Sequence, residues 1–203
     1  YATVQYHSPE LPLGTKAALA YGNGKKDGQS GNTQGVSGQN SMEAYSLQMS
    51  PIDRLNIHAA YYEVKDYSDG VVSEEQLEEG GSWAATYSVG NATFGYGKSY
   101  KAPETTTATR AAGATTIEHT ENTGLSIGYS VNEDLSLSYT REESEANYQT
   151  SATVSNDVEM DSIQVAYSLG GATLSVARAD YENVGYELNK DITETIIAMS
   201  FAF

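Results

Sequence analysis

The chain has no cysteine, only four prolines, and 11 basic residues against 27 acidic ones. Without cysteine it can form no disulfide, thiolate metal site or cysteine nucleophile. The formal net charge of -16 argues against a nucleic-acid partner, because binding to phosphates requires cations. Its longest unbroken apolar run is five residues, 17–21, whereas a membrane-spanning helix needs about 20. These absences exclude disulfide-stapled, nucleic-acid-binding and helical membrane proteins.

Tyrosine and glycine are abundant instead, with 16 and 19 residues. Apolar side chains recur at every second position in many segments. In residues 192–203, one face carries Ile197, Met199, Phe201 and Phe203, and the other carries mostly small or polar side chains. Because successive side chains of a β-strand point to opposite sides, this pattern predicts strands with one apolar face.

The same alternation predicts eleven strands and no helix, which indicates an all-β antiparallel fold. The predicted strands cover residues 1–8, 15–23, 41–51, 54–65, 81–89, 92–101, 121–131, 135–146, 158–169, 172–182 and 192–203. The connections alternate between short, turn-forming ones and long polar ones. The short ones are 9–14, 52–53, 90–91, 132–134 and 170–171, and the long ones are 23–40, 66–80, 102–120, 147–157 and 184–191.

This alternation of connections is typical of a transmembrane β-barrel, whose turns are short at one membrane surface and long at the other. A soluble sandwich would bury the apolar faces between two sheets and has no reason to sort its loops. We therefore predict an antiparallel transmembrane β-barrel.

Cations follow the apolar side chains on three strands. Lys98, Arg141 and Arg178 each occupy the next same-face position after an apolar stretch. Tyrosine favours the membrane interface, while lysine and arginine reach towards lipid phosphates. The pattern predicts a basic, lipid-phosphate-binding rim at the outer end of the barrel. The plainer alternative is that these charges mark strand ends entering solvent.

Two segments resemble Gram-negative general porins. Residues 4–22, VQYHSPELPLGTKAALAYG, are similar to a porin stretch in which a Ser-Pro turn and a Gly-containing bend lead into a strand ending in tyrosine. The alternating Ile197, Met199, Phe201 and Phe203 resemble the C-terminal strand that the outer-membrane assembly machinery reads in that family. The resemblance implies a sixteen-stranded, trimeric barrel in the outer membrane of a Gram-negative bacterium, in contact with lipid and lipopolysaccharide.

Eleven strands are an odd number, whereas such barrels have an even one. We therefore expect residues 1–203 to form a single domain that is the C-terminal part of a porin barrel. Five strands and the constriction loop would then be absent, and a separate N-terminal fragment would be a partner. The alternative is one miscounted strand in a smaller, complete barrel.

The resemblance implies passive diffusion of small hydrophilic solutes and ions through a water-filled channel, with no enzymatic activity. The polar strand face would line it, with the wall residues Thr3, Gln5, His7, Lys16, Gln48, Asn56, His58, Tyr62 and Gln164. For each of these residues, the simpler interpretation is a hydrated wall position without a specific ligand.

One long connection is strongly acidic. Its carboxylates are Asp66, Asp69, Glu74, Glu75, Glu78 and Glu79. Such a vestibule would concentrate cations and give the channel a cation preference. It could also hold a divalent cation such as Ca²⁺, although no EF-hand spacing is present and no other cofactor is expected. The alternative is that these charges keep an exposed loop soluble.

Two rival functions remain open at this stage. One is a non-transporting all-β outer-membrane surface protein, such as an adhesion or binding barrel, that acts through its long acidic loops. The other is a soluble sandwich enzyme. No catalytic or metal-binding motif stands in the sequence, and the three histidines lack metal-ligand spacing.

Overall fold

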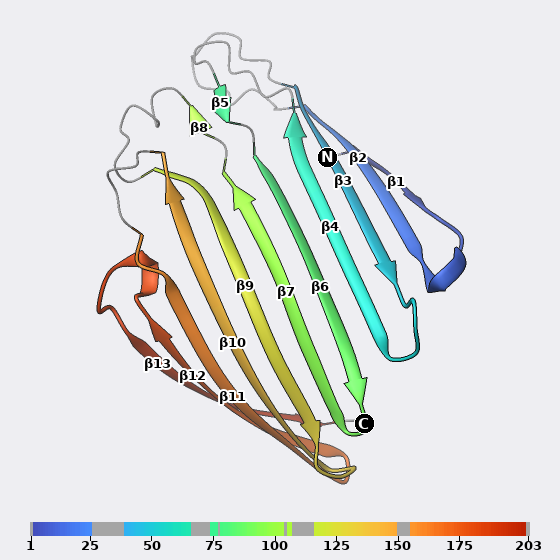
Figure 1. Ribbon diagram of the computed structural model, residues 1–203, viewed down its shortest axis with the longest axis vertical. Helices are drawn as coiled ribbons and strands as arrows, with labels where there is room; N and C mark the ends of the chain where they lie inside the picture. Colours follow the sequence, from blue (N-terminus) through green and yellow to red (C-terminus); the bar gives the residue numbers. More distant parts are fainter. Residues whose placement is uncertain are drawn as a thin grey trace.

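The computed structural model describes residues 2–25, 39–65, 74–76, 78–103, 105–106, 116–149 and 155–201. Eleven strands form one antiparallel sheet in which neighbours in the chain are neighbours in space (Figure 1). They are β1 (Ala2–His7), β2 (Lys16–Lys25), β3 (Gln39–Met49), β4 (Leu55–Lys65), β6 (Glu79–Val89), β7 (Ala92–Ala102), β9 (Ile117–Ser130), β10 (Leu135–Tyr148), β11 (Val158–Leu169), β12 (Ala172–Glu182) and β13 (Ile192–Phe201). The predicted all-β class and the eleven antiparallel strands are confirmed.

Two short strands were not predicted. β5 (Glu74–Gln76) and β8 (Thr105–Thr106) form a separate two-stranded ladder within segments expected to be loops. Several of the main strands also run further into the long connections than predicted, because cross-strand pairing continues there. For example, β9 already begins at Ile117 and pairs with the end of β10.

The connections are sorted between the two ends of the sheet. The short turns lie together at the lower end in Figure 1, whereas β5 and β8 lie at the upper end. Gly90 and Gly170 have φ angles of 57° and 61° in two of these turns, a conformation that glycine adopts without a steric penalty. The first turn contains η1 (Pro12–Gly14), and the β12–β13 connection, at the opposite end, contains η2 (Val184–Tyr186).

The sheet has no hydrophobic core. Among the described residues, only two apolar side chains are buried, those of Ala102 and Ala146. Large apolar side chains are exposed instead, with Ile163 62% and Ile197 70% accessible. No helix in the described part of the chain is long and apolar enough to cross a membrane. The sheet therefore presents its apolar residues outward.

Cross-strand register places the apolar residues on one face. Directly paired residues share a face, and one row runs from Tyr129 through Leu137, Val165 and Val176 to Ile197 on five successive strands. The other face carries rows of small polar residues. One such row contains Ser82, Ser99, Asn122 and Ser144.

The sheet bends, so that β11, β12 and β13 turn away from the plane of β4 to β9 (Figure 1). Strands β1 and β13 stand at its two edges, and the described residues place no strand beyond either.

Candidate channel wall

The small polar face is the concave one, because hollows open on it. One hollow is lined by side chains from β1 to β4, including His7, Lys16, Gln48 and His58. Another spans β10 to β12 and includes Ser138, Gln164 and Ser175. The convex face carries the apolar side chains. The molecule therefore has the inside-polar, outside-apolar polarity of a membrane barrel rather than that of a soluble sandwich.

The structure brings all nine predicted wall residues to this concave face. Lys16 pairs with Gln48 and Gln48 with His58, so these three form one cross-strand row. By register, the same face carries Thr3, Gln5, His7, Asn56, Tyr62 and Gln164. The nine residues thus share one face, and their role as a channel wall stays a prediction.

The ring of Tyr62 packs against the neighbouring strand β6. A β-carbon at the paired position, Gly80, would stand 2.6 Å from Cε1 of the Tyr62 ring. The ring therefore occupies the space that a side chain at position 80 would fill. Its hydroxyl donates to Oε1 of Glu78 at 3.0 Å, and the same oxygen lies 3.5 Å from Nζ of Lys101.

The predicted acidic vestibule is described only in part. Asp66 and Asp69 lie outside the described residues, and only the backbone is described for Glu74 and Glu75. Glu78 is paired with Lys101.

Glu79 lies on the convex face, where its carboxylate accepts a hydrogen bond of 2.8 Å from the Tyr61 hydroxyl. It thus points away from the concave face.

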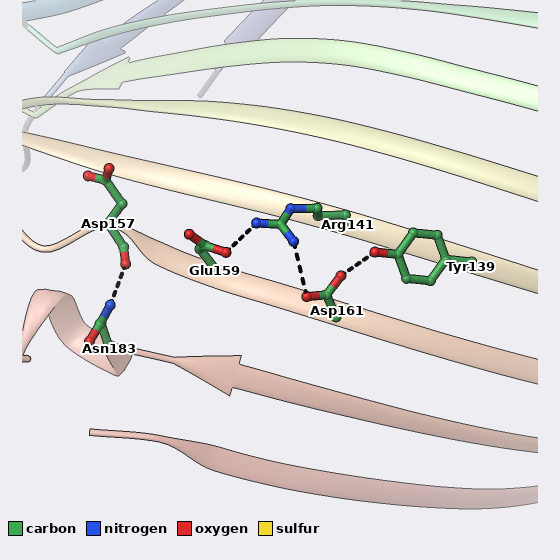
Figure 2. Close-up of polar contacts among 6 residues, drawn as sticks. All are labelled: Tyr139, Arg141, Asp157, Glu159, Asp161 and Asn183. Atoms are coloured by element: carbon green, nitrogen blue, oxygen red, sulfur yellow. Dashed lines mark hydrogen bonds and ion pairs between the residues drawn. The ribbon is translucent and has the colours of Figure 1, made fainter. Parts of the chain in front are cut away.

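The predicted basic rim lies on the convex face, beyond the apolar band. Arg141 is held between two carboxylates of β11, Glu159 and Asp161, and Asp161 also accepts a hydrogen bond from Tyr139 (Figure 2).

Arg178 makes two hydrogen bonds of 3.2 Å to Asp180, whereas Lys98 has no ion pair within the described part of the chain. Carboxylates thus share this rim with the cations. Binding to lipid phosphate stays a prediction.

The C-terminal pattern is described up to Phe201. Ile197, Met199 and Phe201 lie on the convex face with at least 58% of each residue exposed. Phe203 lies outside the described residues.

Three features of the concave side were missed by sequence reasoning. Glu142 and Glu194 line a common hollow that contains no basic residue. Lys101 also faces this side. The sequence carried a signal for Glu142, Glu194 and Lys101, because each occupies an alternating position on the polar side of its strand. The third feature is Tyr186. Its position depends on the fold of a connection, and the sequence carried no such signal for it.

No metal centre is assembled by the described residues, which contain no group of three or more histidine, aspartate or glutamate side chains able to hold an ion. A divalent cation at the acidic connection stays a prediction, since most of its carboxylates are outside this description.

Comparison with known proteins gives a likeness of fold. No model of a known protein family matches the chain, and no curated protein matches it in sequence. Among solved structures, an anion-selective porin from Comamonas acidovorans superimposes with a TM-score of 0.71 at 11% identity, over 99% of this chain and 59% of the porin. The match with LpxR from Salmonella typhimurium has a TM-score of 0.37 at 7% identity and covers 99% of this chain and 88% of LpxR. The first likeness shows a porin-like fold, and the chain spans 59% of that porin's length.

Proposed function

We propose that this chain forms part of the wall of a water-filled channel in the outer membrane of a Gram-negative bacterium. Small hydrophilic solutes and ions would diffuse through it down their gradients. The observation that carries the proposal is the opposite polarity of the two faces of one curved sheet. The convex face is apolar with no core behind it, and the concave face is lined by serine, threonine, glycine and alanine with few charges.

Lipid is the solvent that suits the convex face. Soluble monomers rarely expose a contiguous apolar patch larger than a few hundred Å². Here the exposed apolar residues run across the sheet from Val4 on β1 to Phe201 on β13. In a bilayer this surface contacts acyl chains, and the tyrosines of the sheet lie near the interface, where their rings are favoured.

The two edge strands of the sheet, β1 and β13, need pairing partners if the sheet is to close into a barrel. An unpaired strand edge is costly in hydrocarbon, because its N–H and C=O groups find no water there. We propose that further strands pair with β1 and β13 and complete a porin barrel of sixteen strands. The expected source is a separate N-terminal fragment of the same porin, and trimers of the completed barrel remain part of the proposal.

A preference for cations is the finer part of the proposal. Among the described concave side chains, Glu142 and Glu194 line a hollow without a cation. The described strand cations on this face are Lys101, which is paired with Glu78, and Lys16, which lines a different hollow. The net charge of -16 adds a negative potential along the path. Carboxylates near a pore attract cations and repel anions.

At the convex rim, Lys98 is the cation best placed to bind a lipopolysaccharide phosphate, since Arg141 and Arg178 already pair with carboxylates. The carboxylates of the acidic connection supply the oxygen ligands that Ca²⁺ prefers, so a bridging calcium ion belongs to the same proposal.

Reconstitution in planar bilayers tests the channel. The protein as it occurs in the membrane should give stepwise, ohmic conductance, and its reversal potential in a salt gradient should indicate cation preference. The double variant Glu142→Gln/Glu194→Gln should shift that potential towards zero by several millivolts. Glu145→Gln is the matched control, because Glu145 lies on the convex face. A protein that inserts but never conducts would contradict the channel and favour a surface-binding barrel.

A further inference from the structure

The β12–β13 connection, residues 183–191, reaches across the sheet. Its Tyr186 hydroxyl lies 2.9 Å from Oγ of Ser144 on β10. Strand β11 separates β10 from β12, and adjacent strands are about 4.8 Å apart, so the connection extends roughly 10 Å sideways from its own strand.

Register identifies the side of the sheet on which this contact lies. Ser144 pairs with Asn122, which pairs with Ser99, and Ser99 pairs with Ser82. All four belong to the small polar, concave face. The Tyr186 hydroxyl therefore stands on the concave side, at the end of the sheet where the long connections lie.

Further hydrogen bonds hold the connection against the segment that precedes β11. Nδ2 of Asn183 donates to the carbonyl oxygen of Asp157 at 3.0 Å (Figure 2), and Nδ2 of Asn156 donates to the carbonyl oxygen of Tyr186 at 3.2 Å. With the hydroxyl contact, the connection is attached at three points to elements other than its own strands.

The connection is also closed at its base. The backbone N–H of Val184 donates to the carbonyl oxygen of Lys190 at 2.8 Å, and that of Asn183 donates to Oδ1 of Asp191 at 3.1 Å. Nζ of Lys190 lies 3.0 Å from Oε1 of Glu187. These bonds restrict changes in the shape of the connection itself.

The backbone of the connection is unusual for its residues. Asn183, Gly185, Tyr186 and Asn189 all have left-handed φ angles between 55° and 72°. Asparagine and glycine adopt this region readily, but a tyrosine does so only against a steric penalty. Because Tyr186 is bonded through both its carbonyl and its hydroxyl, tertiary contacts impose this conformation.

We propose that residues 183–191 are a fixed constriction element of the channel, with Tyr186 as the residue that positions it. The element narrows the lumen at the long-connection end and thereby lowers the upper size limit for hydrophilic solutes. This inference rests on the proposed channel function and adds a determinant of solute size to it.

Single cysteines test this inference cleanly, because the chain has none of its own. Leu188 lies within the connection and is 67% exposed, while Ile52, 60% exposed, lies in the short β3–β4 turn at the other end. Each would be changed to cysteine in the otherwise unaltered protein, inserted in planar bilayers and treated with a bulky, water-soluble thiol reagent. Modification of Leu188→Cys should lower the single-channel conductance by about a fifth or more, because the reagent adds volume at a narrow point. Modification of Ile52→Cys should leave the conductance unchanged.

A second experiment uses a variant that should widen the constriction. Tyr186→Ala should raise the swelling rate of proteoliposomes in a trisaccharide about twofold, with a smaller effect on a pentose. Tyr186→Phe, which removes only the hydroxyl contact, should give a swelling rate between that of the parent protein and that of Tyr186→Ala. Channels that conduct normally but show no effect of either Leu188→Cys modification or Tyr186→Ala would overturn the constriction and leave the channel intact. Absence of conductance in the unmodified protein would instead overturn the channel itself, and the constriction with it.

Discussion

The aromatic ring of Tyr62 packs over Gly80 on the neighbouring strand. The two residues are paired across β4 and β6, and a β-carbon on Gly80 would come within 2.6 Å of ring atom Cε1 and 3.2 Å of Cζ. Glycine at position 80 thus provides the space in which this large side chain of the concave face packs. The ring also carries its hydroxyl to Glu78, to which it donates a hydrogen bond of 3.0 Å.

Gly80→Ala should therefore lower the single-channel conductance, because the added methyl group displaces the Tyr62 ring from the wall into the lumen. Gly128→Ala is a matched control, since it lies on the same face and a β-carbon there meets nothing closer than 4.0 Å. Combining Gly80→Ala with Tyr62→Ala should restore the conductance. A Gly80→Ala channel as conductive as the parent would contradict this arrangement.

Removal of the Arg141 charge should weaken the convex rim. In Arg141→Gln, Glu159 and Asp161 lose their shared cation and repel each other and Glu143, which is paired with Glu159. These groups are more than a third exposed, so solvent screening keeps the expected loss of unfolding free energy small, and added salt should diminish it further.

Urea unfolding in lipid vesicles would measure this loss. Arg54→Gln serves as the control, because the ion pair of Arg54 within the described residues joins it to its exposed neighbour Asp53 in a turn. Asp161→Asn added to Arg141→Gln should recover part of the stability. An Arg141→Gln protein that is as stable as the parent at low salt would show that the rim pairs are not stabilising.

A lysine introduced on the apolar face should lower the stability of the protein far more than a lysine introduced on the polar face. Val165 and Gln164 are adjacent on β11 and point to opposite sides, Val165 in the apolar row and Gln164 on the concave wall. Lysine facing lipid near the middle of a barrel costs about 2–4 kcal/mol. Val165→Lys should therefore reduce stability in vesicles by that amount, whereas Gln164→Lys should change it little. Equal losses for both variants would mean that β11 does not separate lipid from water.

The sheet could be predicted from the sequence because each strand repeats its polarity every second residue. Ile163, Val165 and Tyr167 carry this signal over one strand, and register then extends it to the whole face. β5 and β8 were missed because strands of three and two residues are too short to show a period.

The details of the wall depend on contacts between strands, which no single segment encodes. Tyr62 was predicted on the polar face, but the packing of its ring depends on Gly80, 18 positions further along the chain. Tyr186 stands in a connection whose left-handed backbone is imposed by partners on β10 and before β11. The pairing of Arg141 similarly required the register of β10 with β11.

The central claim is that one face of the sheet contacts lipid and the other contacts water. It is tested most directly by single cysteines at four successive positions of β11, Ile163, Gln164, Val165 and Ala166. Their reactivity towards a small, charged thiol reagent would be measured in intact outer membranes and again after denaturation. We predict that cysteines at 164 and 166 react in the membrane, and that those at 163 and 165 react only after denaturation. Equal reactivity at all four positions, or the opposite alternation, would contradict the account.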